Sequence, residues 1–126
     1  MWFSLSVPCD SRYLETVHDL VARVAEQVGF DSPTSSGIAI SIHAAMQTIM
    51  GRVASAGQGA VFDFRFSTGD SRFDVAVRMS GCEGVPETAL SSFWGEVSPG
   101  AMDRVEFERQ DGACVCRMSR LLPPRG

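Results

Sequence analysis

Apolar and polar residues alternate with a period of two near the start of the chain and again in its middle, and this pattern predicts strands. Phe3, Leu5 and Val7 alternate with serines, which is typical of a strand with one buried face. Residues 60–66 and 73–79 repeat the pattern with several phenylalanines and are joined by the turn sequence STGDS. We therefore expect a first strand with one buried face and an antiparallel hairpin.

A second hairpin is predicted near the end of the chain. Residues 104–109 and 113–120 alternate in the same way around QDG, and the sequence LLPPRG that follows is expected to be a tail. The pattern identifies an inward face only in the first of these strands, at Val105 and Phe107. The segment 81–101 between the hairpins is irregular, and a short helix over Glu87 to Trp94 is one interpretation of it.

A period of 3.6 residues predicts two helices between the first strand and the first hairpin. The first helix has Asp10 or Ser11 as its N-cap, Gly29 as its C-terminal stop and His18 on its polar side. Its apolar stripe consists of Leu14, Val17, Val21, Val24 and Val28, with Leu20 and Ala25. After the polar link DSPTSSG, a more apolar second helix is expected from Gly37 to Ala54.

The second helix carries two polar side chains, His43 and Gln47, on the side that the pattern assigns to the core. A helical wheel places them opposite a narrow polar wedge of Ser41, Thr48 and Arg52. Buried polar groups need partners, so we expect either a structural pair bonded to the sheet or part of a functional site.

The order of the predicted elements is strand, helix, helix, two strands, an irregular segment and two strands. Helices on one face of a mostly antiparallel sheet define an α+β fold, a two-layer sandwich. The chain has 126 residues and a mass of 13.6 kDa, which favours a single domain over residues 1–126.

Charge and composition exclude several functions. The formal net charge is −4 and every cation is an arginine, so we expect no nucleic-acid partner, no Schiff-base lysine and no P-loop lysine. No apolar run reaches the length of a membrane span, and the N-terminus lacks a basic region. These features predict a cytoplasmic protein without a membrane partner.

The four cysteines are Cys9, Cys82, Cys114 and Cys116, and their scattered spacing favours reduced thiols over a disulfide framework. Cys114 and Cys116 point the same way on a strand, so a zinc site with a third ligand is the less favoured alternative, because the spacing matches no usual zinc pattern.

Beyond these patterns, the run FSLSVPCDSRYLETVHDLVARVAEQVGF, followed by SGIAISIHAAMQTIMGRV, resembles the opening of bacterial anti-sigma regulatory factors. These are serine-protein kinases of the histidine-kinase-like ATPase (GHKL) superfamily. MDRVEFERQDGACVCRMSRLL is similar to the closing strands of that family, so the resemblance covers nearly the whole chain. It implies the two-layer fold of that superfamily, with ATP and Mg²⁺ as cofactors where activity is retained.

The resemblance also assigns site positions on the second helix. In the family a motif E-A-x-x-N-x-x-x-H supplies the general base and the Mg²⁺ ligand. Here it falls on His43, Ala44, Gln47 and Gly51, so His43 stands at the general-base position and Gln47 at the metal-ligand position.

Two further family features fall after the first hairpin. The motif D-x-G-x-G, whose Asp bonds the adenine amino group, falls on Met79, Ser80 and Gly81, so that only the first glycine remains. The glycine-rich ATP lid should occupy Cys82 to Ala101, which is too short for the lid and its following helix. Met79 has no useful acceptor for adenine.

Three functions are consistent with these residues. The favoured hypothesis is an anti-sigma-type regulator that binds a protein partner, a sigma factor or a STAS-domain antagonist, with a homodimer as a further option, and needs no cofactor. The second is a divergent serine kinase that uses His43 as base and Gln47 as Mg²⁺ ligand. The third is a small-molecule or redox sensor that uses the vacated nucleotide pocket, with Cys82 at the entrance of that pocket. Phe93 and Trp94 are either a partner-binding anchor or a core plug.

Overall fold

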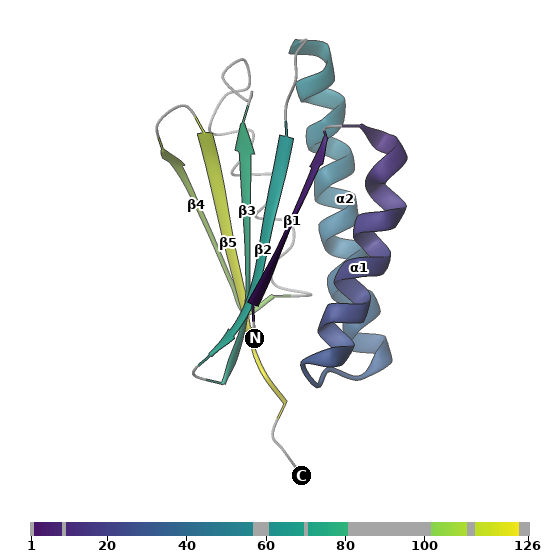
Figure 1. Ribbon diagram of the computed structural model, residues 1–126, viewed down its shortest axis with the longest axis vertical. Helices are drawn as coiled ribbons and strands as arrows, with labels where there is room; N and C mark the ends of the chain where they lie inside the picture. Colours follow the sequence, from purple (N-terminus) through teal and green to yellow (C-terminus); the bar gives the residue numbers. More distant parts are fainter. Residues whose placement is uncertain are drawn as a thin grey trace.

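The computed structural model describes residues 2–8, 10–56, 61–69, 71–80, 102–110 and 113–123. Predictions that concern residues 81–101, among them Gly81, Cys82 and the helix from Glu87 to Trp94, lie outside the described residues, as does Cys9. The helices and strands are β1 (Trp2–Pro8), α1 (Leu14–Gln27), α2 (Ser32–Ala56), β2 (Val61–Gly69), β3 (Arg72–Ser80), β4 (Arg104–Gln110) and β5 (Ala113–Leu121), with a 3₁₀ turn at Ser11–Tyr13 before α1 (Figure 1).

The strands form one five-stranded sheet in the order β1-β2-β3-β5-β4, and every pairing is antiparallel. Both predicted hairpins are confirmed, with Phe62 opposite Met79 in the first and Phe107 opposite Cys116 in the second. The second hairpin joins the sheet through β5, so its later strand lies next to β3 and β4 becomes an edge.

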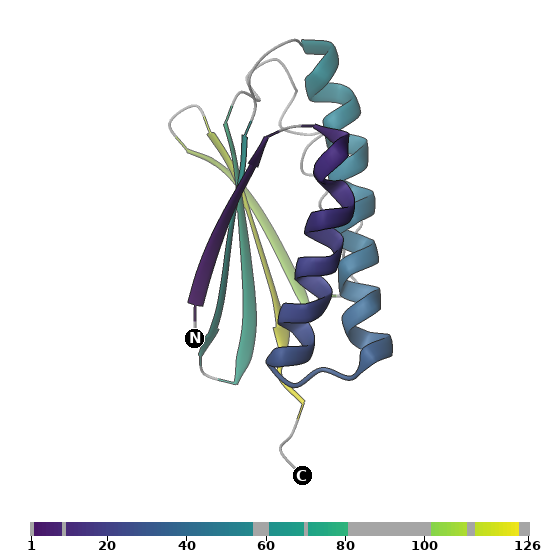
Figure 2. The ribbon, with the colours of Figure 1, turned by 45° about the vertical axis from the view of Figure 1, so that its right-hand side comes forward.

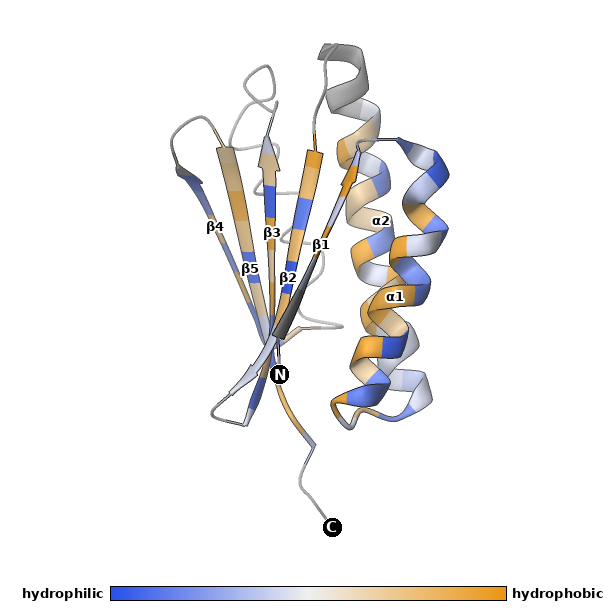
Figure 3. Ribbon diagram, viewed as in Figure 1, coloured by the Kyte–Doolittle hydropathy of each residue, from blue (hydrophilic) through white to orange (hydrophobic). Residues whose placement is uncertain are grey.

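Both helices cover the same face of the sheet, and no other described helix or strand packs on the opposite face, which we call the open face (Figure 2). Apolar and polar residues alternate along β2 and β3, because successive side chains of a strand point to opposite faces (Figure 3). The inward positions of β2, β3 and β5 are buried at Phe62, Phe64, Phe66, Phe73, Val75, Val77, Met79, Cys114, Cys116 and Met118. The expected α+β two-layer arrangement is therefore present in the described residues.

The first helix forms where its sequence predicts, but it begins at Leu14 with Tyr13 at the N-cap, so neither Asp10 nor Ser11 is its N-cap. Asp10 caps the turn that leads into α1 by accepting a 2.9 Å hydrogen bond from the backbone N–H of Arg12. Gly29 ends the segment with φ of 115°, a conformation that side chains disfavour. The buried positions of α1 are Leu14, Val17, Val21, Val24 and Ala25.

The second helix begins earlier than its sequence suggests. It starts at Ser32, so the expected link DSPTSSG and the start at Gly37 were wrong. Asp31 accepts a 2.8 Å hydrogen bond from the backbone N–H of Thr34, and Pro33 lies in the first turn, where its missing N–H costs little. Hydrogen bonds from the side chain and backbone of Thr34 lower the pKa of Asp31 below its ordinary value.

The sequence after β5 is more than a tail. Leu122 packs against the core and its backbone N–H donates a 2.9 Å hydrogen bond to the carbonyl of Ser71 in the first hairpin turn. This contact ties the end of the described chain to the turn between β2 and β3.

Candidate functional site

The predicted polar pair on α2 is not buried as a pair. Gln47 is exposed and His43 is half-buried, so the expectation that solvent cannot reach them was wrong for Gln47 and only partly right for His43. The core side of α2 instead carries Ile38, Ala39, Ile42, Ala45, Met46, Ile49 and Met50. The outward side carries the small or uncharged residues Ser36, Ile40, Ala44, Thr48 and Gly51. Because this outward row is barely polar, the hydrophobic pattern placed the solvent-facing side of the helix incorrectly.

His43 reaches a hollow between the two helices. The hollow has a volume of about 500 Å³ and is lined by Glu15, His18, Asp19, Ile40 and His43. The rings of His18 and His43 meet edge to face, with centroids 5.9 Å apart. His18 Nδ1 also lies 3.3 Å from a carboxylate oxygen of Asp19. His18, expected to be a solvated surface residue, is thus half-buried against the second helix.

The chemistry available to this hollow is limited. Within the described ranges, no group of three or more His, Cys, Asp and Glu side chains is placed to hold a metal ion. His43 makes no hydrogen bond to another described residue, so no such bond sets its tautomer, and its ring contacts only that of His18 among the aromatic side chains described. A general base needs a positioned substrate proton within hydrogen-bond reach, and the residues described around the hollow form no phosphate cradle.

The other predicted site residues do not line this hollow. Met79 is 2% exposed on the inward face of β3, opposite Phe62 on β2 and Cys114 on β5. Gln47 is exposed on α2 but does not line the hollow. Gln47 is one helical turn from His43 on α2, whereas Met79 lies in the sheet, and the structure does not place Met79 in the hollow that His43 lines.

The two cysteines of β5 point to the same face, as predicted, and both are buried. Burial raises the pKa of the Cys116 thiol to about 12. A thiol with that pKa stays protonated at neutral pH, and metals bind the thiolate. The buried pair is therefore better explained as part of the core than as zinc ligands.

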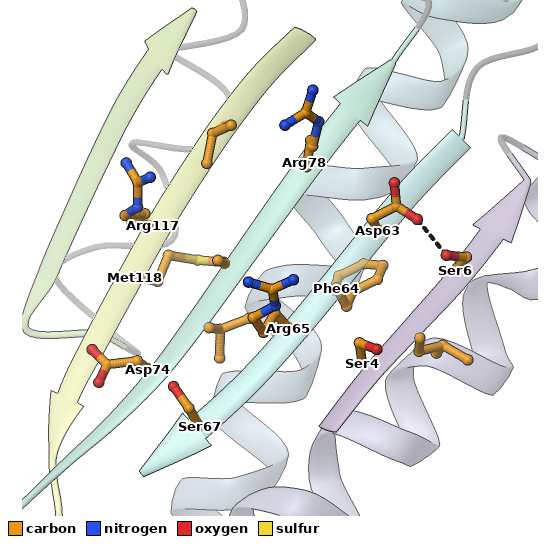
Figure 4. Close-up of a pocket in the computed structure, with 14 residues that line it drawn as sticks. Ser4, Ser6, Asp63, Phe64, Arg65, Ser67, Asp74, Arg78, Arg117 and Met118 are labelled. Carbon is orange, nitrogen blue, oxygen red and sulfur yellow. Dashed lines mark hydrogen bonds between the residues drawn. The ribbon is translucent and has the colours of Figure 1, made fainter. Parts of the chain in front are cut away.

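A second hollow lies on the open face of the sheet, and it was not predicted from the sequence. It has a volume of about 560 Å³ and is lined by side chains of β1, β2, β3 and β5 (Figure 4). Arg65 on β2 and Arg117 on β5 stand on either side of Ala76 on β3, and Arg78 lies two residues further along β3. Alternation identifies these positions as outward, but only the strand order makes them neighbours.

The fold and these surfaces define a class: a two-layer α+β protein whose antiparallel sheet is covered by two helices on one face and presents charged side chains on the other. None of the helices in the described segments is long and apolar enough to cross a membrane. No family model matches the sequence, and no curated protein matches it. Membership of the histidine-kinase-like ATPase superfamily therefore stays a prediction from the resemblance.

Proposed function

We propose that this chain is a regulatory protein of the anti-sigma-factor type, which acts by binding a protein partner and has lost the nucleotide site of its family. The burial of Met79 carries the proposal. At the position where the family has an adenine-binding carboxylate, this chain has a thioether that is 2% exposed and packed in the core. A side chain so placed offers adenine no hydrogen-bond acceptor.

The position of the Mg²⁺ ligand supports the same proposal. Gln47 has one methylene more than the asparagine of the family, and its side chain is exposed. Mg²⁺ requires near-ideal octahedral geometry at short distances and dehydrates reluctantly, so a single exposed carboxamide without a neighbouring carboxylate or phosphate binds it weakly.

The partner that we propose is a sigma factor or a STAS-domain antagonist, with a homodimer as a further option. Two exposed surfaces support a binding role. One is the uncharged outward row of α2, in which Ile40 is 59% exposed, and the other is the open face of the sheet. Exposed apolar side chains on a surface helix are a feature of protein-binding surfaces.

A divergent serine kinase is the second candidate, and the accessibility of His43 favours it. The His43 ring lines an open hollow and is not engaged by a hydrogen bond to the described residues. It would be available as a general base if MgATP and a substrate serine were positioned nearby.

Calorimetric titration with ATP and with ADP, each with and without Mg²⁺, separates the two candidates. A ligand that binds only the folded state at about 100 times its Kd stabilises that state by about 2.7 kcal/mol, so thermal unfolding in millimolar MgATP provides a second readout. The regulator is expected to show no heat of binding and no change in Tm. Nucleotide binding together with phosphorylation of a STAS-domain serine that is lost in His43→Ala would establish the kinase instead.

The binding role is tested separately by size-exclusion chromatography with purified sigma factors and STAS-domain proteins of the same organism. A stable complex with one of them is the expected result. A strictly monomeric protein that binds none of them would contradict the proposed function.

A further inference from the structure

Two arginines in the middle of the open sheet face form no ion pair with any of the described residues. Arg65 and Arg78 are both exposed, and neither forms an ion pair or a side-chain hydrogen bond with another residue in the described part of the chain. Arg65 is opposite Ala76, two residues before Arg78, so the two arginines are diagonal neighbours on one face. Such neighbours lie about 7–8 Å apart at their Cα atoms, close enough for one acidic side chain to be attracted by both.

The acids closest to these arginines are neighbours on the same face but form no ion pair with them. Asp63 is the register partner of Arg78, yet it accepts a hydrogen bond from Ser6 and makes no ion pair with Arg78 (Figure 4). Asp74 is a diagonal neighbour of Arg65 and makes no ion pair with it either.

The acids of the edge strand β4 form ion pairs with other arginines. Glu108 forms an ion pair with Arg117, and Glu106 forms one with Arg104 at 2.8 Å. The hollow on this face is lined by three arginines, Arg65, Arg78 and Arg117, and two aspartates, Asp63 and Asp74, so positive charge is in slight excess there.

The shape of this region allows a partner side chain to approach the guanidinium groups. Ala76 lies between Arg65 and Arg117 in the sheet, and its small methyl side chain leaves space between the two longer arginine side chains. Guanidinium groups bind carboxylates through paired N–H donors, and such charge-assisted hydrogen bonds are stronger than neutral ones.

We propose that the surface formed by Arg65, Arg78 and Ala76 docks an acidic segment of the protein partner, an inference that rests on the proposed function. Charge complementarity selects a peptide rather than a nucleic acid. A polyphosphate chain would also meet Asp63, Asp74, Glu106 and Glu108 on the same face, and the protein has a net charge of −4. Separate carboxylates can contact the central arginines and avoid those acids.

The test uses a fluorescein-labelled glutamate oligopeptide and an equally charged thymidine oligonucleotide as probes, with fluorescence anisotropy at low ionic strength. Wild type is compared with the double variant Arg65→Ala, Arg78→Ala and with the matched control Arg23→Ala, which removes an exposed arginine from α1 on the helical layer. The glutamate peptide is expected to bind wild type and the control, and to bind the double variant about tenfold more weakly. All three proteins should have the same Tm, because the substituted side chains are exposed.

Three results would overturn this docking surface: no binding of the glutamate peptide to wild type, equal binding to the double variant, or tighter binding of the oligonucleotide. The proposed function is judged by the separate complex with a sigma factor or STAS-domain protein. If that complex forms equally well with wild type and the double variant, the regulator proposal stands and the partner docks elsewhere.

Discussion

Replacing Met79 by aspartate introduces the residue type that binds adenine in the family that the sequence resembles, and we expect this change to unfold the protein rather than to create a site. Met79 is 2% exposed and lies between Phe62 and Cys114 in the sheet. Burial of a methionine side chain contributes about 2 kcal/mol, which the variant loses. The new carboxyl group would also have to leave water for the apolar layer between sheet and helices.

The cost of the carboxyl group depends on pH. Desolvation raises the pKa of a buried carboxyl by about 3 units, here from about 3.9 in the unfolded chain to about 7 in the folded protein. A group whose pKa is higher in the folded state destabilises it increasingly as pH rises from the unfolded to the folded pKa. The Met79→Asp protein should therefore lose about 6 kcal/mol at pH 7 and about 3.5 kcal/mol at pH 5, apolar burial included.

Urea unfolding followed by circular dichroism at both pH values measures this difference, and thermal unfolding provides a second estimate at about 4 °C per kcal/mol. Met79→Leu is the control, because a swap of similar volume costs less than about 1.5 kcal/mol at either pH. A loss of under about 1 kcal/mol for Met79→Asp at both pH values would refute the reasoning. It would mean that position 79 faces water, as an adenine-binding residue must.

Three further changes test other parts of the structure. Gly51→Ala should raise the free energy of unfolding by about 0.5–1 kcal/mol, because a Cβ at position 51 meets no atom within 4 Å. Gly29→Ala should lower the free energy of unfolding by about 1 kcal/mol, because φ of Gly29 is 115°. Changes of the opposite sign in urea unfolding would contradict both predictions. Mass spectrometry should find Cys116 unmodified by iodoacetamide at pH 8 unless urea is added; rapid native labelling would contradict its burial. Asp31→Ala should lower Tm at pH 7, because it removes the N-cap of α2. The difference in Tm between this variant and wild type should vanish as pH falls through the lowered pKa of Asp31. A difference in Tm that stays constant with pH would exclude the capping role of the Asp31 carboxylate.

The sheet could be predicted where two independent signals agreed. Alternation marked Phe62, Phe64 and Phe66 as inward, and the short turn after them left little freedom in register, so the pairing with β3 followed. The strand order did not follow in the same way. The position of β5 between β3 and β4 depends on the packing of the second hairpin, and this position places Arg117 beside Ala76.

The helices show where local patterns are insufficient. The start of α2 depends on the capping carboxylate of Asp31, which the polar composition of DSPTSSG concealed. The exposure of Gln47 depends on which side of α2 meets the sheet, and a helix whose outward row is made of serine, alanine and isoleucine gives a weak signal of that side. The contact between His18 and His43 depends on how two helices cross, which neither helix encodes alone.

The pairing of β1 with β2 has a consequence for the order of folding. Trp2 lies opposite Ser67 and Pro8 lies opposite Val61, so both helices are contained in the loop that this pairing closes. During synthesis β1 is made before α1 and α2, but it can pair only when β2 has been made. The helices α1 and α2 are consecutive in the chain, so they can pack together earlier through contacts that are close in sequence. Until β2 arrives, the N-terminal strand is an unpaired edge that another chain could capture, and its docking is expected to be a late, slow step.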